Sequence, residues 1–221
     1  VLAKAAATLD VMTGGRVEVG LGAGGMWDGI ASYGGPRRAP GEAVEALDEA
    51  IQVMRLLWDS SEPVSLPGRH YQLDNAKPGP APAHRIGVWL GALGPRMLRL
   101  TVRAADGWLI SVPYVPPPQV PPMQALIDDG ARRAGREPSA IRRGYNLMGI
   151  IELPNRPTMR PTRKGATVGP VAQWVEEIVG YYRDLRMDTF AFWPLADEEA
   201  QARAFVEQVV PEVVRGLRAE G

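Results

Sequence analysis

Cysteine is absent from this chain of 221 residues, and it holds only two histidines. Without cysteine there can be no disulfide framework, no thiolate nucleophile, no iron–sulfur cluster and no cysteine-ligated zinc site. His70 and His84 stand too far apart for a metal-binding pair on one helix, and we expect both to be surface residues. The sequence therefore predicts no metal site.

An excess of charge of one sign is also lacking, because 25 basic residues balance 25 acidic ones. No extended basic stripe offers the positive surface that nucleic acid or an anionic membrane would need. No apolar run reaches the roughly 18 to 20 residues of a membrane span, and no signal-peptide pattern opens the chain. We expect a cytoplasmic protein whose partner is a small-molecule substrate, with no nucleic acid and no membrane.

Two common catalytic motifs are missing as well. The chain has neither a G-x-S-x-G motif nor a phosphate-cradling Walker loop. Serine hydrolase and P-loop ATPase activities therefore lack support.

Glycine is concentrated in the most informative stretch of the chain, from Gly14 to Gly25. The stretch is typical of a buried strand that runs into a glycine-rich turn, where a ligand can touch bare backbone. Gly20, Gly22 and Gly25 form a G-x-G-x-x-G pattern, but a long loop over 26–40 is expected next in place of a helix. This argues against a dinucleotide-binding fold. A tight strand exit without a ligand is the alternative.

Helical and strand patterns alternate along the rest of the chain, with crossovers long enough to join parallel strands. A proline-rich segment over 60–85 is interpreted as a hairpin insertion, and residues 154–169 as a mobile loop. We expect helices at 2–10, 42–58, 95–105, 123–134, 170–186 and 197–214, the last kinked near Pro211, and strands within 14–25 and at 86–90, 107–111, 145–153 and 189–193.

This order gives five βα units in a single domain over residues 1–221 and predicts a parallel α/β protein. A complete (β/α)8 TIM barrel takes about 250 residues, so about three strands, on the order of 80 residues, would be missing. The chain starts at Val1 instead of a methionine, which agrees with a chain that opens inside a barrel. The predicted fold class is α/β, a (β/α)8 barrel of which about five βα units are present.

The second strand of this series leads into a turn suited to an anion. Gly91, Ala92, Gly94, Pro95 and Arg96 follow the strand at 86–90 and open a helix. Free amides at a helix N-terminus attract an anion, the glycines permit close approach, and arginine adds a charge. The alternative is that Gly94 and Pro95 only start the helix and that Arg96 points to water.

Polar and aromatic residues also follow other strands. Ser111, Tyr114, Glu152 and Trp193 stand at strand ends, where a barrel enzyme builds its pocket. Ser111 and Tyr114 are the candidate substrate contacts among them.

Several segments in order resemble the luciferase-like monooxygenase superfamily. The hairpin resembles that family's EPV…G-x-x-Y-x-L pattern, and the glycine-rich turn after the first strand resembles the F420-dependent reductases more than the aldehyde luciferases. The matching segments are 2–10, 14–24, 41–58, 63–73, 88–96 and 104–108.

The resemblance implies a TIM barrel that binds FMN or the deazaflavin F420 at the carboxyl ends of its strands. It implies that Gly22, Ala23 and Gly24 lie beside the cofactor ring and that the turn at 91–96 lies near its phosphate. Trp27 and Asp28 would line the pocket mouth, although Trp27 could equally pack under its own loop. A homodimer is the usual family state and is expected here.

The resemblance leaves the catalytic residues unknown. Some F420 enzymes place an acidic residue just after the glycines, where this chain has Gly25. Other family members place an important histidine or acid on the first three strands, which this chain is expected to lack. A non-catalytic partial barrel that acts as a binding or structural subunit is therefore the main alternative to an oxidoreductase, and a phosphate-binding barrel of unrelated chemistry is another.

Overall fold

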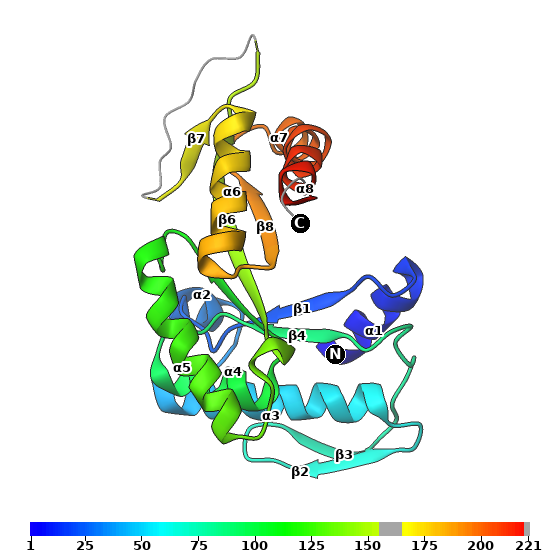
Figure 1. Cartoon of the computed structure of the whole chain (residues 1–221). Helices are drawn as coiled ribbons and strands as arrows, with labels where there is room; N and C mark the ends of the chain where they lie inside the picture. The colour runs from blue at the N-terminus through cyan, green and yellow to red at the C-terminus, as the bar shows by residue number, and fades with distance from the viewer. Residues whose placement is uncertain (155–164, 219–221) are drawn as a thin grey trace. The chain divides into compact units, whose positions relative to one another are not determined.

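The computed structural model describes residues 1–154 and 165–218, which group into two compact units (Figure 1). The first unit comprises Val1–Trp108 with Arg133–Gly135, and the second comprises Leu109–Arg132 with Arg136–Gly221. No helix in the described ranges combines the length and apolarity that crossing a membrane requires. The single domain expected over 1–221 stays a prediction.

The strands β1 (Glu18–Leu21), β4 (Gly87–Leu90) and β5 (Gly107–Ser111) are parallel, as the sequence predicts. Strand β1 pairs with β4, and β4 pairs with the first two residues of β5. Leu21 lies opposite Leu90, so the two strands end level with each other. Because the carboxyl ends of parallel strands meet at one edge, the segments that follow β1 and β4 become neighbours.

Helices cover one face of these strands. Val19, Val88 and Leu90 are buried in a core that includes Ile51 and Leu100. Since successive side chains of a strand point to opposite faces, Glu18, Gly20 and Trp89 lie on the other face. The helices of this unit are α1 (Leu2–Thr13), α2 (Trp27–Ser32), α3 (Pro40–Asp59) and α4 (Pro95–Ala104).

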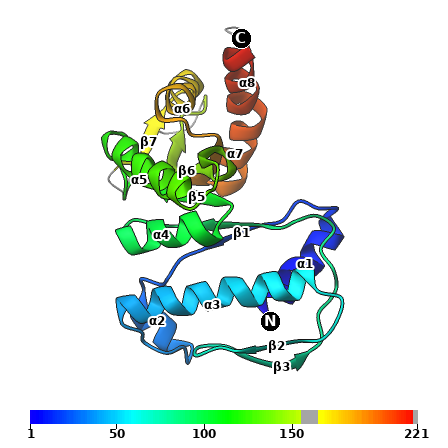
Figure 2. The same cartoon turned by 60° about the horizontal axis from the view of Figure 1, so that its bottom comes forward.

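The predicted insertion is an antiparallel hairpin of β2 (Val64–Pro67) and β3 (Gln72–Ala76). Helix α3 lies between β1 and this hairpin in both Figure 1 and Figure 2. The short helix α2 was not expected, because its glycines suggested an uninterrupted loop over 26–40.

The amino ends of β4 and β5 are joined by Asp106. Its carboxylate accepts a hydrogen bond of 2.8 Å from the Val88 amide and forms ion pairs with Arg55 of α3 and with Arg85. Burial raises the pKa of Asp106, but the Val88 amide and Arg55 outweigh it and lower that pKa below its usual value. The carboxylate therefore stays ionised and fixes the strands to α3.

In the second unit the long strand β6 (Arg142–Ile151) has parallel neighbours. It pairs with β8 (Thr189–Pro194) along most of its length and with β7 (Thr167–Gly169) near its end. Strand β7 falls in the segment expected to be a mobile loop, whose residues 155–164 lie outside the described part of the chain. The helices are α5 (Val120–Arg133), α6 (Val171–Leu185), α7 (Glu198–Ala204) and α8 (Val210–Arg218), with short 3-10 turns at Pro117–Gln119 and Pro138–Ala140.

The last two helices are joined by a π-helical turn, Phe205–Val209. Pro211 follows after Val210, and its ring would crowd the carbonyl of Glu207 in a regular helix while supplying no amide hydrogen. A wider turn just before the proline relieves this crowding. The predicted distortion near Pro211 thus takes the form of a π turn, and it places Phe205 against the rings of Phe192 and Trp174.

A buried ion pair ties α5 to β6. Nη2 of Arg143 lies 2.6 Å from Oδ1 of Asp128, and their side chains are only 6% and 8% exposed. Arg186 adds a second ion pair to Asp128 at 2.9 Å. Arg143 also donates a hydrogen bond to the Ile141 carbonyl.

Replacing Arg143 by alanine should leave the buried Asp128 carboxylate with Arg186 as its remaining ion-pair partner. Breaking a buried ion pair costs about 3 to 5 kcal/mol, and the remaining Arg186 contact favours the lower end. Urea unfolding of the Arg143→Ala variant measures this loss. Arg132→Ala is the matched control, because its pair with Asp129 is exposed and should contribute about 0 to 1 kcal/mol. Equal losses in the two variants would contradict the structural role of Arg143.

Candidate functional site

One backbone hydrogen bond brings the two glycine turns together. The Gly91 amide donates to the Leu21 carbonyl at 2.9 Å, just where β4 and β1 end. The turn through Gly22 and Gly24 therefore lies beside the turn through Gly94 and Arg96. Both segments predicted to bind a cofactor occur at the same edge of the first unit.

The turn at 91–96 presents an uncapped helix N-terminus. Gly94 is extended at the N-cap of α4, Pro95 is the first helical residue, and no side chain caps the helix. The fully buried Ala92 accepts a hydrogen bond of 2.9 Å from Trp108 Nε1, which holds the turn in place. The first amides of a helix have no intrahelical partner, so this end of α4 can accept an anion.

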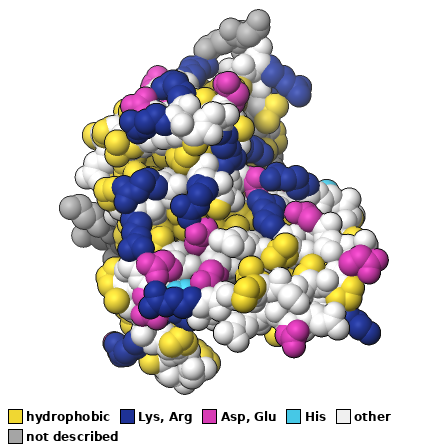
Figure 3. Space-filling model, turned by 90° about the horizontal axis from the view of Figure 1, so that it is seen from below, with side chains coloured by type: hydrophobic (Ala, Val, Ile, Leu, Met, Phe, Trp, Pro, Cys, Tyr) yellow, Lys and Arg dark blue, Asp and Glu magenta, His cyan; other side chains and the backbone are white. Residues whose placement is uncertain are grey.

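Arg96 is engaged on α3. Its Nη2 lies 2.7 Å from Oε1 of Glu45. The other carboxylate oxygen of Glu45, Oε2, lies 3.1 Å from Nη1 of Arg69. A Cβ on Gly41 would fall 2.6 Å from Arg96 Nη1, so the guanidinium lies across the first turn of α3. Figure 3 shows acidic and basic side chains next to each other at several places on the face that it presents.

The turn after β1 is open at its first glycine and tightly packed at the second. A Cβ on Gly22 would meet nothing within 4 Å, whereas one on Gly24 would lie 2.9 Å from the Trp27 ring. Gly24 also has φ of 102°, which favours glycine. Trp27 thus packs on its own turn, while Asp28 is exposed and pairs with Arg37.

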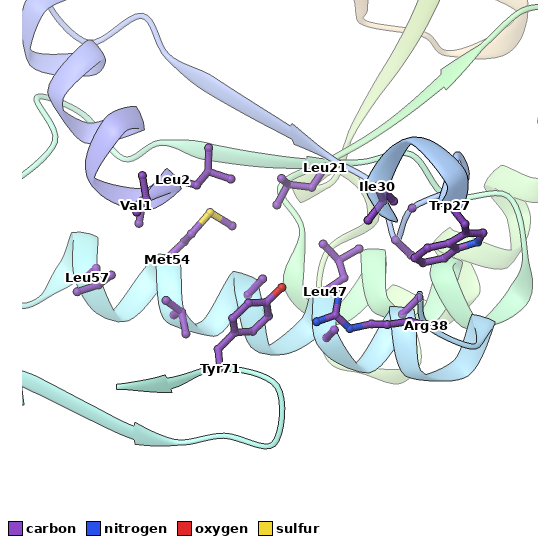
Figure 4. Close-up of a pocket in the computed structure, with 18 residues that line it drawn as sticks. Val1, Leu2, Leu21, Trp27, Ile30, Arg38, Leu47, Met54, Leu57 and Tyr71 are labelled. Carbon is purple, nitrogen blue, oxygen red and sulfur yellow. The ribbon is translucent and has the colours of Figure 1, made fainter. Parts of the chain in front are cut away.

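A cavity of about 400 Å3 lies between the turn after β1 and α3 (Figure 4). Leu47 and Met54 of α3 face Leu21 across it, so its walls are largely apolar. Arg38 lines it and makes no ion pair or hydrogen bond within the described residues. Gly22, Ala23, Gly24 and Trp27 line this cavity, and Asp28 and the residues at 91–96 do not.

On the opposite face of the strands, four polar side chains form a chain of contacts. Trp89 Nε1 donates to Glu18 Oε2 at 2.6 Å, and Glu18 Oε1 lies 3.7 Å from Nε2 of His84. Nδ1 of His84 lies 2.8 Å from Oδ1 of Asp10. Asp10 is fully buried and accepts hydrogen bonds from the amides of Val17, Ala83 and His84.

These contacts correct the expectation that both histidines are surface residues. His84 touches a buried carboxylate, and the His70 side chain is only 6% exposed. No sequence motif marks either contact, because Asp10 and His84 are far apart along the chain. Within the described residues, no group of three or more histidine, aspartate or glutamate side chains could hold a metal ion.

Asp10 and His84 shift each other's ionisation. Burial raises the pKa of Asp10, but the Val17 amide and His84 outweigh it and lower that pKa to about 2. The Asp10 carboxylate, followed by Glu18, raises the pKa of His84 against the effect of burial. The pairing thus favours the charged form of each group.

The remaining predicted residues belong to the second unit. Ser111 Oγ accepts a hydrogen bond of 3.3 Å from Asn146, and Tyr114 and Trp193 are exposed. Glu152 is exposed and its amide donates to the Gly169 carbonyl. Their part in a substrate pocket stays a prediction.

Parallel strands that end in two adjacent glycine turns beside a helix N-terminus define an α/β protein with a candidate anion-binding edge. A model of the luciferase-like monooxygenase family matches residues 1–153, so the chain belongs to this family.

Two curated relatives match much of the chain. A phthiodiolone/phenolphthiodiolone dimycocerosates ketoreductase of Mycobacterium tuberculosis is 36% identical over 160 residues, 71% of this chain and 40% of the ketoreductase. An F420-dependent glucose-6-phosphate dehydrogenase of Nakamurella multipartita is 27% identical over 219 residues, 99% of this chain and 62% of that enzyme. The chain therefore spans less than two thirds of the length of either relative.

Solved structures show the same fold. An F420-dependent secondary alcohol dehydrogenase in complex with an F420–acetone adduct is similar over 96% of this chain and 74% of its own, with a TM-score of 0.78 and 20% identity. A riboflavin lyase with modified FMN and riboflavin is similar over 97% of this chain and 67% of its own, with the same TM-score and 13% identity. The predicted family and the α/β fold of luciferase-like TIM-barrel enzymes are confirmed.

The sequence reasoning missed Glu18, Trp89 and Arg38. Glu18 and Trp89 were counted only as parts of apolar strands. The signal for Glu18 is alternation, since Val17, Val19 and Leu21 are separated by Glu18 and Gly20, whereas the apolar run around Trp89 shows none. Such a pattern gives a strand one helix-packed face and one face that is nearly bare. Arg38 carries no such signal.

Stability should depend on pH through His84. Because the folded-state pKa of His84 is raised, its contribution is fully present below the ordinary value of 6.5 and is lost as pH rises through the raised value. The Asp10 contribution behaves oppositely: it is present above 3.8 and is lost as pH falls toward 2. The melting temperature of His84→Gln should fall below that of the wild type by more at about pH 5 than at about pH 9. A difference that does not change with pH would contradict the His84–Asp10 pairing.

Proposed function

We propose that this chain carries the cofactor-binding edge of an oxidoreductase that uses F420 in preference to FMN. The observation that carries the proposal is the pairing of two glycine turns beside the uncapped N-terminus of α4. Family membership supports a flavin or deazaflavin cofactor, and the Nakamurella relative is named as F420-dependent. The activity of the whole protein is part of the proposal.

The residues at this edge fit such a cofactor. Gly22 and Gly94 have open space where a side chain would stand, so a ring or a phosphate can approach the backbone. The amides at the start of α4 would bind the phosphate, with Ala92 held in place by Trp108. When bound, the cofactor supplies the hydride chemistry, and the chain binds, orients and shields it.

Hydride transfer to or from a small organic substrate is favoured over monooxygenation. The Mycobacterium relative is named as a ketoreductase, which points to a carbonyl and its alcohol as the reacting pair. Ser111 and Tyr114 are the proposed substrate contacts of the second unit. Trp27 and Asp28 are the proposed contacts of the first.

We also propose that the protein forms a homodimer. Helix α1 exposes Leu2, Leu9 and Met12, and α8 exposes Val210 and Val214, each at least 40% exposed. Exposed apolar side chains along one face of a helix, as on α1 and, separately, on α8, favour a protein partner. The same exposure favours the alternative that this chain is a non-catalytic binding or structural subunit, which the following experiment distinguishes.

Titration of the chain with F420 and, separately, with FMN should show saturable binding and a raised melting temperature for F420. Cofactor fluorescence reports binding, and sedimentation of the same sample reports the dimer. Selective binding of FMN would show that the cofactor is FMN and not F420. Failure of the folded chain to bind either would favour the non-catalytic subunit.

Arg96→Ala should weaken cofactor binding by about 1.5 to 3 kcal/mol if Arg96 leaves Glu45 to contact the phosphate. The partner variant Glu45→Gln should have the opposite effect, because it frees Arg96 from its ion pair. Dissociation constants from the same titration measure both. If the Arg96–Glu45 ion pair is purely structural, both variants should lower the melting temperature equally and leave the cofactor affinity unchanged.

A further inference from the structure

We infer that Trp89 is a positioning residue whose indole forms the floor beneath the cofactor ring. This inference rests on the proposed function, because it assigns a role within the same site. Trp89 is not among the residues proposed above to bind the cofactor, and no similar protein described above gives it a role. Its support comes from the register of three neighbouring strands.

Trp89 stands in a row of glycines. In the paired strands, Gly20 of β1 lies opposite Trp89 of β4, and Trp89 lies opposite Gly107 of β5. The indole is therefore the only side chain in this row of three, and it lies on the face away from α3. A large ring flanked by glycines on both sides can lie along the sheet instead of standing up from it.

The glycines are required by this arrangement. A Cβ on Gly107 would fall 2.1 Å from the Trp89 ring, so the indole lies directly over Gly107. A Cβ on Gly87 would likewise fall 2.0 Å from Oε2 of Glu18. Two glycines thus seat the two side chains, and no larger residue fits at either position without moving them.

Glu18 fixes the orientation of the indole. Its Oε2 accepts the hydrogen bond of 2.6 Å from Trp89 Nε1, which removes rotational freedom from the ring. The Glu18 side chain is 53% exposed, whereas Trp89 is 6% exposed. A ring that is held this firmly and is nearly covered acts as a floor rather than as a movable wall.

The backbone beyond this floor is bare. Gly22 follows the end of β1 and Gly91 follows the end of β4. They come two residues after Gly20 and Trp89, so they lie on the same face, about 7 Å closer to the carboxyl edge. Gly20, Gly22 and Gly91 are all exposed, and a Cβ on Gly20 or Gly22 would meet nothing within 4 Å. A planar ring entering at the carboxyl edge would thus contact backbone at its side and the indole at its base.

A flat aromatic ring is the ligand chemistry that such a floor suits. Aromatic rings prefer offset-stacked or edge-to-face contacts, and the small exposed part of the indole would make such a contact with the cofactor ring. The phosphate-accepting end of α4 lies on the exit of the same strand, β4, so one strand supplies the base for the ring and the turn for the phosphate.

The test compares Trp89→Phe with Trp58→Phe. Trp58 of α3 is buried in the same helix-packed core as Val88 and donates to the Ala3 carbonyl at 2.8 Å, so each variant loses one tryptophan and one hydrogen bond of its indole. Each is titrated with F420 and with FMN, following cofactor affinity, tryptophan emission and the visible absorption band of the bound cofactor. Trp89→Phe should weaken binding roughly threefold to tenfold, shift the visible band and remove most of the tryptophan quenching that binding causes. Trp58→Phe should keep the band position and the quenching.

Glu18→Ala is the second variant, which keeps the indole and removes its hydrogen-bond partner. It should shift the visible band of the bound cofactor in the same direction as Trp89→Phe, and it guards against a Trp89 variant that fails to fold. A visible band and a dissociation constant unchanged in both Trp89→Phe and Glu18→Ala would overturn the floor while leaving the proposed function intact. Absence of binding by the folded wild type would overturn both.

Discussion

The pairing of β1 with β4 is the constraint on which the candidate site depends. The register that sets Leu21 opposite Leu90 makes both strands end level, and the Gly91 amide closes the pair on the Leu21 carbonyl. A shift of β1 by one residue against β4 would turn β1 over and exchange its two faces. Val19 and Leu21 would then lose their contacts with the core beneath the helices, and Glu18 would point into that apolar core.

Glycine has two different uses in this site. Where a cofactor is proposed to approach, at Gly22 and Gly94, the missing side chain leaves open space. At Gly87 and Gly107 the space is already filled, by Glu18 and by the Trp89 ring. The abundance of glycine in these segments thus reflects both access for a ligand and close packing of the residues beneath it.

Much of the fold followed from the sequence, because apolar spacing and proline positions are local signals. The helices at 42–58 and 95–105 and the strand at 107–111 appear within a few residues of their expected ends. Strand β7 was missed because it has only three residues, Thr167–Gly169, which are too few to show a pattern of apolar spacing. Asp10–His84 and Arg96–Glu45 were also missed, since a contact between distant residues depends on the assembled fold.

The buried carboxylate of Asp10 has a consequence for the order of folding. It accepts the amide of Ala83, 73 positions away, so this bond forms only after a long loop has closed. Helix α3 and the hairpin lie inside that loop and consist of local contacts, which form fast, whereas closing the loop carries an entropy cost that grows slowly with its length. The β1–β4 pair, with the edge that it builds, is therefore expected to assemble late, on a framework that is already in place.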